Sequence, residues 1–217
     1  MKSDKIGILG SGVVGKTLAL GFQKHGYKVM IGSREPQKFD EWKTKEKFEG
    51  ETGTFEEVAA FADILVLAVK GSVVDEAIKL AGLENMKYKI MIDASNPIDD
   101  LSPTDGVLNF FTETDNSLME QLQNGFPDIK FVKAFNSVGA AHMVNPKFKG
   151  GKPSMFICGN DLEAKKKVKE ILELFGWETE DMGTEVAARA IEPLCMLWCI
   201  PGLRENNWDH AFKLLKK

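Results

Sequence analysis

Short apolar runs alternate along the chain with longer segments whose apolar residues recur every three or four positions. The apolar runs predict strands at 5–9, 27–31, 64–69, 89–93, 129–135, 154–158 and 177–181. The longer segments predict helices at 12–25, 55–62, 71–80, 118–122 and 162–175, with a weakly helical stretch from 35 to 50. This alternation predicts a doubly wound α/β (Rossmann) fold whose mostly parallel sheet has about eight strands.

The two ends of the chain differ in their hydrophobic pattern. The run at 64–69 is apolar at nearly every position, which is typical of a strand buried on both faces of a parallel sheet. From Thr184 onward the pattern predicts a helical tail that Pro201 and Gly202 interrupt. We therefore expect an α/β domain over 1–183 and a small C-terminal helical segment over 184–217. The tail is apolar on all sides, so we expect a dimer interface or a lid over a second-substrate pocket to bury it.

The segment between the first strand and the first helix fits two phosphate-binding patterns at once. Gly10, Gly12 and Gly15 have the dinucleotide spacing Gly-x-Gly-x-x-Gly, while the same segment up to Thr17 fits the P-loop pattern Gly-x-x-x-x-Gly-Lys-Thr. Both patterns hold phosphate with backbone N–H groups and the positive end of a helix. Asp93 supports the P-loop interpretation, because it ends an apolar strand as a magnesium-binding aspartate would.

The end of the second strand favours the dinucleotide interpretation. A dinucleotide site has its ribose-binding residue about 20 residues after the glycines, and an acidic residue there binds the 2′-hydroxyl of NAD. This chain has Ser33 and Arg34 at that position, with Lys38 one helical turn further on. A hydroxyl, a guanidinium and an ammonium suit the 2′-phosphate of NADP. On this interpretation Lys16 is an exposed residue of the first helical turn.

The composition and charge of the chain limit the classes of partner that we expect it to bind. The 217 residues carry a net charge of −4 with a pI near 5.5, so the chain has no basic footprint for nucleic acid. We expect no signal peptide, because a strand begins within a few residues of the N-terminus, and no membrane span, because no apolar stretch reaches spanning length. The 3 cysteines lack zinc spacing and suit a reducing cytoplasm, so we predict no metal site.

Several motifs follow one another in the order found in one family. They are Gly10-Ser11-Gly12-Val13-Val14-Gly15, Gly32-Ser33-Arg34, Asp93-Ala94-Ser95-Asn96-Pro97, Lys133-Ala134-Phe135-Asn136 and Glu192-Pro193-Leu194. On these motifs the chain resembles, over nearly its whole length, the NADPH-dependent coenzyme F420 reductases, also called coenzyme F420:NADP oxidoreductases. The cytosolic domain of the STEAP metalloreductases is similar in fold and motifs, and pyrroline-5-carboxylate reductase is a more distant relative.

The resemblance implies a homodimer in which NADP(H) exchanges a hydride with a second flat cofactor or substrate, such as the deazaflavin coenzyme F420 or a flavin. Such a transfer depends more on geometry than on acid–base residues. Asn136 and Val138 match positions beside the two rings, and 68–70 matches a loop near the adenine ribose and pyrophosphate. The expected cofactor-binding residues are Gly10, Ser11, Gly12, Val13, Val14, Gly15, Ser33, Arg34, Lys38, Ala68, Val69, Lys70, Asn96, Pro97, Asn136 and Val138.

The candidate catalytic residues are Asn136 and His142. His142 follows the turn after Asn136 and could donate a proton to a reduced acceptor, although a lone histidine beside a helix start is also typical of capping or packing. Other functions stay open: a non-catalytic NADPH-binding sensor, an imino- or keto-acid reductase, or a flavin or ferric reductase. Against an imino-acid reductase, the tail is short for a helical substrate domain.

Two residue pairs in the tail have structural interpretations. Cys195 and Cys199 lie at i and i+4 and are predicted to form part of a core or interface stripe rather than a redox or metal site. Arg189 and Glu192 lie at i and i+3, so we expect them to pair with each other or with a partner subunit.

Overall fold

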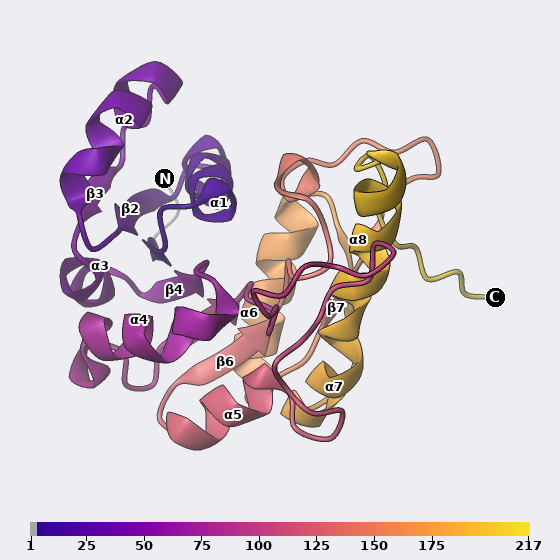
Figure 1. The fold of residues 1–217 in the computed structure, drawn as a ribbon. Helices are drawn as coiled ribbons and strands as arrows, with labels where there is room; N and C mark the ends of the chain where they lie inside the picture. Colours follow the sequence, from indigo (N-terminus) through magenta and orange to yellow (C-terminus); the bar gives the residue numbers. More distant parts are fainter. Residues whose placement is uncertain (1–3) are drawn as a thin grey trace.

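A computed structural model describes residues 4–217 (Figure 1). Its main sheet consists of β1 (Lys5–Leu9), β2 (Lys28–Gly32), β3 (Glu51–Gly53), β4 (Ile64–Leu67), β5 (Ile90–Asp93) and β6 (Lys130–Lys133). The strand order is β3-β2-β1-β4-β5-β6, and every neighbouring pair is parallel. This confirms the doubly wound α/β fold. The direction of winding reverses between β1 and β4, and ligands of such sheets bind outside the carboxyl ends of the strands at this switch point.

Helices cover both faces of the sheet. They are α1 (Val13–Lys24), α2 (Asp40–Glu46), α3 (Phe55–Phe61), α4 (Val74–Ala81), α5 (Leu118–Gly125) and α6 (Leu162–Leu174), with short 3-10 turns at Pro36–Phe39, Gly71–Val73, Leu83–Asn85, Ala140–His142 and Glu185–Ala187. On β4, Ile64 and Val66 face the core that α1 and α6 cover, while Leu65 and Leu67 face the core beneath α3, α4 and α5. Figure 1 shows α1 above β4 and α4 below it. Burial on both faces explains why β4 has no polar position.

The strands near the C-terminus form a sheet of their own. β7 (Ser154–Ile157) and β8 (Glu178–Asp181) pair in parallel with each other, and the main sheet has six strands. The expectation of one sheet of about eight strands is therefore wrong. The end of β7 meets the main sheet through an antiparallel bridge between Lys133 and Cys158. An apolar run identifies a strand but does not specify which strand it pairs with. The short edge strand β3 was missed because it has no apolar alternation.

The C-terminal segment contains α7 (Ala188–Ile191) and α8 (Pro193–Glu205), after which the chain folds back along α8. The predicted interruption at Pro201 is wrong, because α8 continues through it. The ring of Trp208 packs on Gly202, where a Cβ would lie 2.2 Å from the ring. Gly202 is therefore a contact point for the returning chain rather than a helix end. Further on, the Phe212 carbonyl accepts a 2.9 Å hydrogen bond from the backbone N–H of Ser154 at the start of β7.

The run Glu185–Glu205 spans 21 residues and is apolar enough, by length and composition alone, to cross a membrane. This finding differs from the expectation that no stretch reaches spanning length. A core helix of a globular protein passes the same criterion, so the criterion by itself assigns no location to the segment.

Candidate functional site

Each glycine of the loop between β1 and α1 is required for a different reason. Gly10 has a φ of +134°, and a Cβ there would lie 2.3 Å from the carbonyl oxygen of Ala68. A Cβ on Gly15 would lie 2.3 Å from the carbonyl oxygen of Gly10, so Gly15 lets α1 pack closely on β1. A Cβ on Gly12 would meet nothing within 4 Å, so the space beside Gly12 is open to a ligand. These are the three roles that glycines have in a pyrophosphate-binding loop.

The start of α1 faces this open space. Gly12 is the N-cap residue, and no side chain caps the helix. Ser11, Gly12 and Val13 are all exposed. The first backbone N–H groups of a helix have no partner within the helix, and the positive end of the helix dipole adds to their attraction for anions. The loop and helix start together can therefore bind a phosphate.

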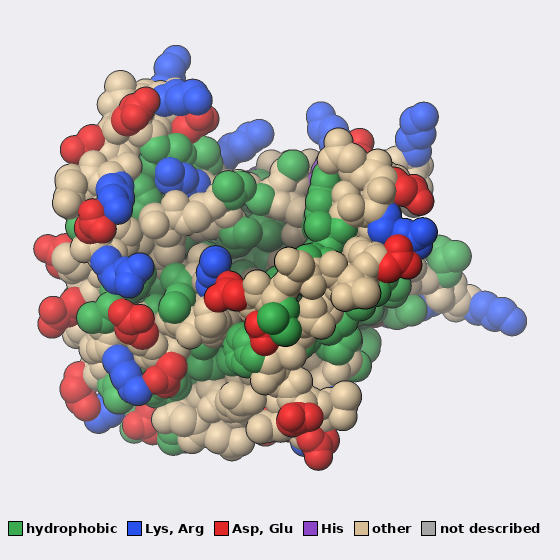
Figure 2. Space-filling model, viewed as in Figure 1, with side chains coloured by type: hydrophobic (Ala, Val, Ile, Leu, Met, Phe, Trp, Pro, Cys, Tyr) green, Lys and Arg blue, Asp and Glu red, His purple; other side chains and the backbone are tan. Residues whose placement is uncertain are grey.

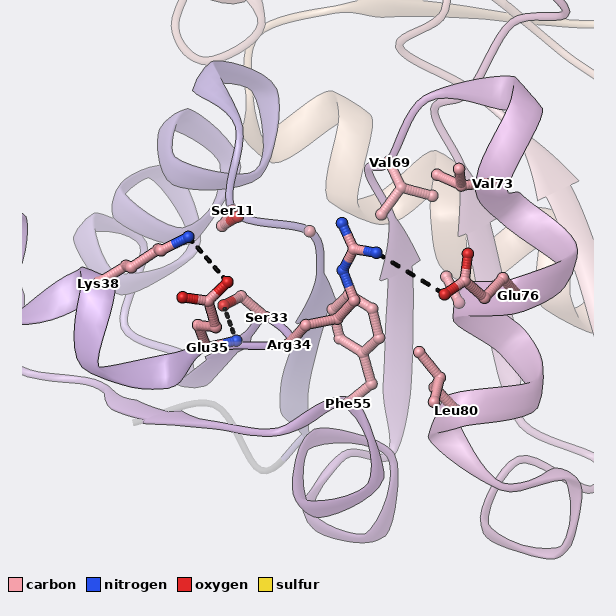
Figure 3. A pocket seen from close by; sticks show the side chains of 12 residues that line it. Ser11, Ser33, Arg34, Glu35, Lys38, Phe55, Val69, Val73, Glu76 and Leu80 are labelled. Carbon is pink, nitrogen blue, oxygen red and sulfur yellow. Dashed lines mark hydrogen bonds and ion pairs between the residues drawn. The ribbon is translucent and has the colours of Figure 1, made fainter.

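A pocket lies beside the glycine loop at the carboxyl end of β2 (Figure 3). It is lined by Gly10, Ser11, Ser33, Arg34, Glu35, Lys38, Phe55, Val69, Val73, Glu76, Ala77 and Leu80. Ser33 is buried, whereas the side chains of Arg34 and Lys38 are exposed. The structure thus brings together the residues that the sequence assigns to a 2′-phosphate.

Two carboxylates pair with the cations of this pocket. Arg34 Nη1 lies 3.7 Å from Glu76 Oε1, and Lys38 Nζ lies 2.9 Å from Glu35 Oε1. The backbone N–H of Glu35 donates a 2.9 Å hydrogen bond to Ser33 Oγ, which fixes the turn and leaves the Ser33 hydroxyl able to donate. Figure 3 shows Arg34 extending from the end of β2 toward α4, the helix that carries Glu76.

A second pocket continues along the carboxyl edge of the sheet and shares Val69 with the first. It is lined by Gly12, Val13, Val14, Ala68, Val69, Lys70, Gly71, Ala94, Ser95, Asn96, Ile98, Asp99 and Asp100. Figure 2 shows the surface hollowed between the part that carries α1–α4 and the part that carries α8, with hydrophobic side chains on its walls. Together the two pockets run from the end of β2, over the glycine loop, to the turn after β5.

The turns after β5 and β6 are joined by an amide network. Asn96 Nδ2 donates to the Asn136 carbonyl oxygen at 2.8 Å, and Asn136 Nδ2 donates to Asn96 Oδ1 at 3.1 Å. Asn136 Nδ2 also donates to the Ile191 carbonyl oxygen at the end of α7, at 2.9 Å. Pro97 and Val138, which the sequence also assigns to the cofactor, are buried beside these turns. Asn136 is itself buried, so its amide holds the two turns and the C-terminal helices in a fixed arrangement.

The ends of β5 and β6 also carry a buried ion cluster that the sequence did not predict. Lys133 Nζ lies 2.6 Å from Asp93 Oδ2 and 2.9 Å from Glu192 Oε1, and it donates to the Ser95 carbonyl oxygen at 3.1 Å. Glu192 also accepts hydrogen bonds from the first backbone N–H groups of α5, both at 3.0 Å. The available indication was that an aspartate ends the apolar strand β5 and a lysine ends the neighbouring strand β6. The cluster ties β5, β6, α5 and the start of α8 together.

The parts of the P-loop pattern have other partners in the structure. Lys16 Nζ lies over two aromatic rings, 5.4 Å from the centroid of Trp42 and 6.0 Å from that of Phe39. Asp93, the candidate magnesium ligand, belongs to the buried ion cluster. Among residues 4–217, no group of three or more His, Cys, Asp or Glu side chains is arranged to hold a metal ion.

His142 contacts the C-terminal chain. Its Nε2 lies 2.7 Å from Asp209 Oδ1, and its ring packs against Phe148 with centroids 4.9 Å apart. These partners are not among the residues assigned to the cofactor. Cys195 is buried and Cys199 is half-buried, as expected for a packing stripe.

The expected pairing of Arg189 with Glu192 is wrong within the chain. Glu192 binds Lys133, and Arg189 Nη2 lies 2.6 Å from Glu120 Oε1. The hydrogen bond from Arg189 is the main reason that the pKa of Glu120 falls from 4.5 to about 2. Sequence spacing favoured the local pair, but both residues reach partners far away in the sequence.

The fold, the glycine loop and the pocket that holds Ser33, Arg34 and Lys38 are those of a dinucleotide-binding protein, and its similarities to known proteins place it in the NADP-dependent oxidoreductase class. The family model "NADP oxidoreductase coenzyme F420-dependent" matches residues 5–97. The crystal structure of a candidate F420-dependent NADP reductase from Arthrobacter sp. FB24 is 32% identical, covers 99% of this chain and 100% of its own, and has a TM-score of 0.92. The chain therefore belongs to the family of coenzyme F420-dependent NADP oxidoreductases.

Two further similarities are informative. Metalloreductase STEAP3 of Rattus norvegicus is 32% identical in an alignment 209 residues long that covers 93% of this chain and 39% of the rat protein. The chain thus spans well under half the length of this relative. Plasmodium falciparum pyrroline carboxylate reductase with NADP bound is 18% identical, covers 84% of this chain and 58% of its own, and has a TM-score of 0.56, which shows a shared fold.

Proposed function

We propose that the chain transfers a hydride between NADP(H) and a second flat redox cofactor or substrate, and that coenzyme F420 is the favoured acceptor. The assignment of NADP(H) rests on the pocket in which Ser33, Arg34 and Lys38 lie together beside the glycine loop. The chain is similar over its full length to the candidate F420-dependent reductase from Arthrobacter, and this similarity supports coenzyme F420 as the acceptor.

The residues of the two pockets fit NADP(H). The open space beside Gly12 leaves room for the pyrophosphate against the first N–H groups of α1. Ser33, Arg34 and Lys38 would hold the 2′-phosphate with charge-assisted hydrogen bonds. Ala68, Val69 and the residues around Asn96 would line the path toward the nicotinamide. When bound, the cofactor supplies the hydride chemistry, and the reduced acceptor takes up one proton to complete the two-electron change.

The contribution of the chain to this reaction is positional. The amides of Asn96 and Asn136 hold the turns after β5 and β6 against the C-terminal helices. The side-chain amides of Asn96 and Asn136 neither gain nor lose a proton at physiological pH. Both residues therefore hold the turns in place and do not act as an acid or a base. Fixed supports are what a transfer between two stacked rings requires, because the rate depends on how the reacting atoms are held.

The direct test is to mix the purified protein with NADPH and oxidised coenzyme F420 and to follow the absorbance of both. We expect both absorbances to fall together in proportion to enzyme. Tight NADPH binding with no oxidation by F420, flavins or ferric chelates would refute a catalytic function and favour a sensor.

A second candidate function is flavin or ferric reduction, which the identity to metalloreductase STEAP3 over most of this chain favours. The same assay distinguishes the two. Turnover with flavins or ferric chelates but none with F420 would assign the acceptor to the second class.

We also propose that the protein is a homodimer. Two leucines on α8 support this, because Leu197 and Leu203 are 55% and 43% exposed on a largely apolar helix. Light scattering should give twice the mass of the chain, and replacing Leu197 by Glu should shift the protein toward the monomer. A monomeric wild-type protein would refute the proposal.

A further inference from the structure

The pocket that holds Ser33, Arg34 and Lys38 also contains a carboxylate, which faces these proposed 2′-phosphate residues from the opposite wall. Glu76 lies on α4, and its Oε1 is 3.7 Å from Arg34 Nη1 across the pocket (Figure 3). Both side chains are more than half exposed to solvent, at 71% for Arg34 and 56% for Glu76. Arg34 therefore has a partner of opposite charge at the place where its guanidinium would meet a phosphate.

Glu76 differs from the neighbouring acid on the same helix. Asp75 Oδ2 lies 2.5 Å from Lys79 Nζ, an i to i+4 pair that stays within α4 and does not line the pocket. Glu76 instead contacts the turn after β2, which is distant in the sequence. Lys38, the other cation of the pocket, is paired with Glu35 of its own turn. Glu76 is thus the carboxylate that α4 contributes to the cations of the pocket.

This arrangement has an electrostatic consequence for the choice of dinucleotide. A 2′-phosphate that approaches Arg34 competes with Glu76 for the guanidinium and is repelled by the Glu76 charge. A ribose with a free 2′-hydroxyl meets neither cost, because Arg34 can keep its carboxylate partner. Glu76 therefore lowers the affinity for NADP(H) and leaves the affinity for NAD(H) almost unchanged.

We propose that Glu76 is a specificity-determining residue whose carboxylate competes with the ribose 2′-phosphate for Arg34 and so limits the preference for NADP(H) over NAD(H). This inference rests on the proposed function, since it assumes that the pocket binds the adenosine end of NADP(H). Exposed ion pairs are weak, and removing the competitor should tighten NADP⁺ binding by about threefold to fivefold. The affinity for NAD⁺ should change by less than about twofold.

The experiment is calorimetric titration of NADP⁺ and NAD⁺ into the wild-type protein, Glu76→Gln and the matched control Asp75→Asn. Glu76→Gln keeps the size of the side chain and removes its charge, and the control removes a charge from the same helix outside the pocket. We expect tighter NADP⁺ binding in Glu76→Gln alone, with a gain that shrinks as salt is added.

Three results would overturn the inference. Unchanged or weaker NADP⁺ binding in Glu76→Gln would show that Glu76 does not compete with the phosphate. An equal gain in Asp75→Asn would show a general effect of net charge. If the wild-type protein has no affinity for NADP⁺, the proposed function fails and the inference fails with it, whereas the first two results leave NADP(H) binding intact.

Discussion

Replacing Lys133 by Met should destabilise the protein strongly, because Lys133 neutralises two carboxylates in the interior. The side chains of Lys133 and Asp93 are 0% exposed and that of Glu192 is 2% exposed. Burial alone would lower the pKa of Lys133, but the charges of Asp93 and Glu192 outweigh it and raise the pKa above its ordinary value of 10.5. A raised lysine pKa contributes stability that is fully present below about pH 10.5 and is lost only at higher pH, so the ion pairs are intact at neutral pH.

The magnitude follows from what the substitution leaves behind. Methionine keeps most of the volume of the lysine stem but removes the ammonium, and the carboxylates of Asp93 and Glu192 then face each other without their shared cation. Removing one partner of a buried ion pair costs about 3–5 kcal/mol. In a domain of this size such a loss lowers the melting temperature by roughly 10 °C.

The assay is urea unfolding at neutral pH, followed by circular dichroism, with Lys130→Met as the control. Lys130 lies on the same strand, and its Nζ is 2.9 Å from Asp161 Oδ2, but these side chains are 37% and 30% exposed. The control should lose no more than about 1 kcal/mol, because water screens a pair near the surface. If the two variants lose similar stability, the assignment of Lys133 as a structurally essential buried cation is wrong.

Three further predictions test the site and the fold. Replacing Arg34 by Ala should weaken NADP⁺ binding by about tenfold or more, since a hydrogen bond to a charged group contributes about 1.5–3 kcal/mol. An equal loss of affinity for NAD⁺ would contradict the 2′-phosphate assignment. Gly12→Ala should lower dinucleotide affinity in titrations without changing the melting temperature. Gly15→Ala should lower both the affinity and the melting temperature, because a Cβ at position 15 would lie 2.3 Å from a backbone oxygen. The pKa of Glu120, lowered from 4.5 to about 2, means that its pairing stabilises the fold above pH 4.5 and that this stability is lost as the pH falls toward 2. In Arg189→Ala, the stability that is lost as the pH falls from 4.5 to 2 should be smaller by about 1 kcal/mol. If the pH profile of urea unfolding does not change, the pairing is refuted.

The elements that the sequence predicted well are those whose signal is local. The continuous apolar run of β4 reflects burial on both faces, and the glycine spacing reflects the tight turn from β1 into α1, where a Cβ on Gly15 would meet the Gly10 carbonyl oxygen. The position of Ser33 and Arg34 was predictable for the same reason, because they end the strand that follows the glycine loop. Their grouping in one pocket follows from the parallel order of β2, β1 and β4.

The features that the sequence did not predict depend on partners far along the chain. Nothing near Lys133 indicates that Glu192 will share its charge, and the spacing of Arg189 and Glu192 indicated a different pair. Pro201 predicted a helix break, but α8 continues through it, and Trp208, six residues past the proline's neighbour Gly202, packs back on that glycine. Tertiary contacts decide these features, and a single sequence does not display them.

The buried ion cluster and the amide network join the same parts of the molecule. Asp93 and Asn96 belong to the end of β5, Lys133 and Asn136 to the end of β6, and Ile191 and Glu192 to the junction of α7 and α8. The C-terminal helices therefore cannot shift relative to the sheet without separating buried charges, which costs far more than breaking a surface contact. A hydride transfer that relies on fixed geometry has no need of an acid–base pair at this position. The fully buried charges, which take no direct part in the proposed chemistry, are what would hold its geometry constant.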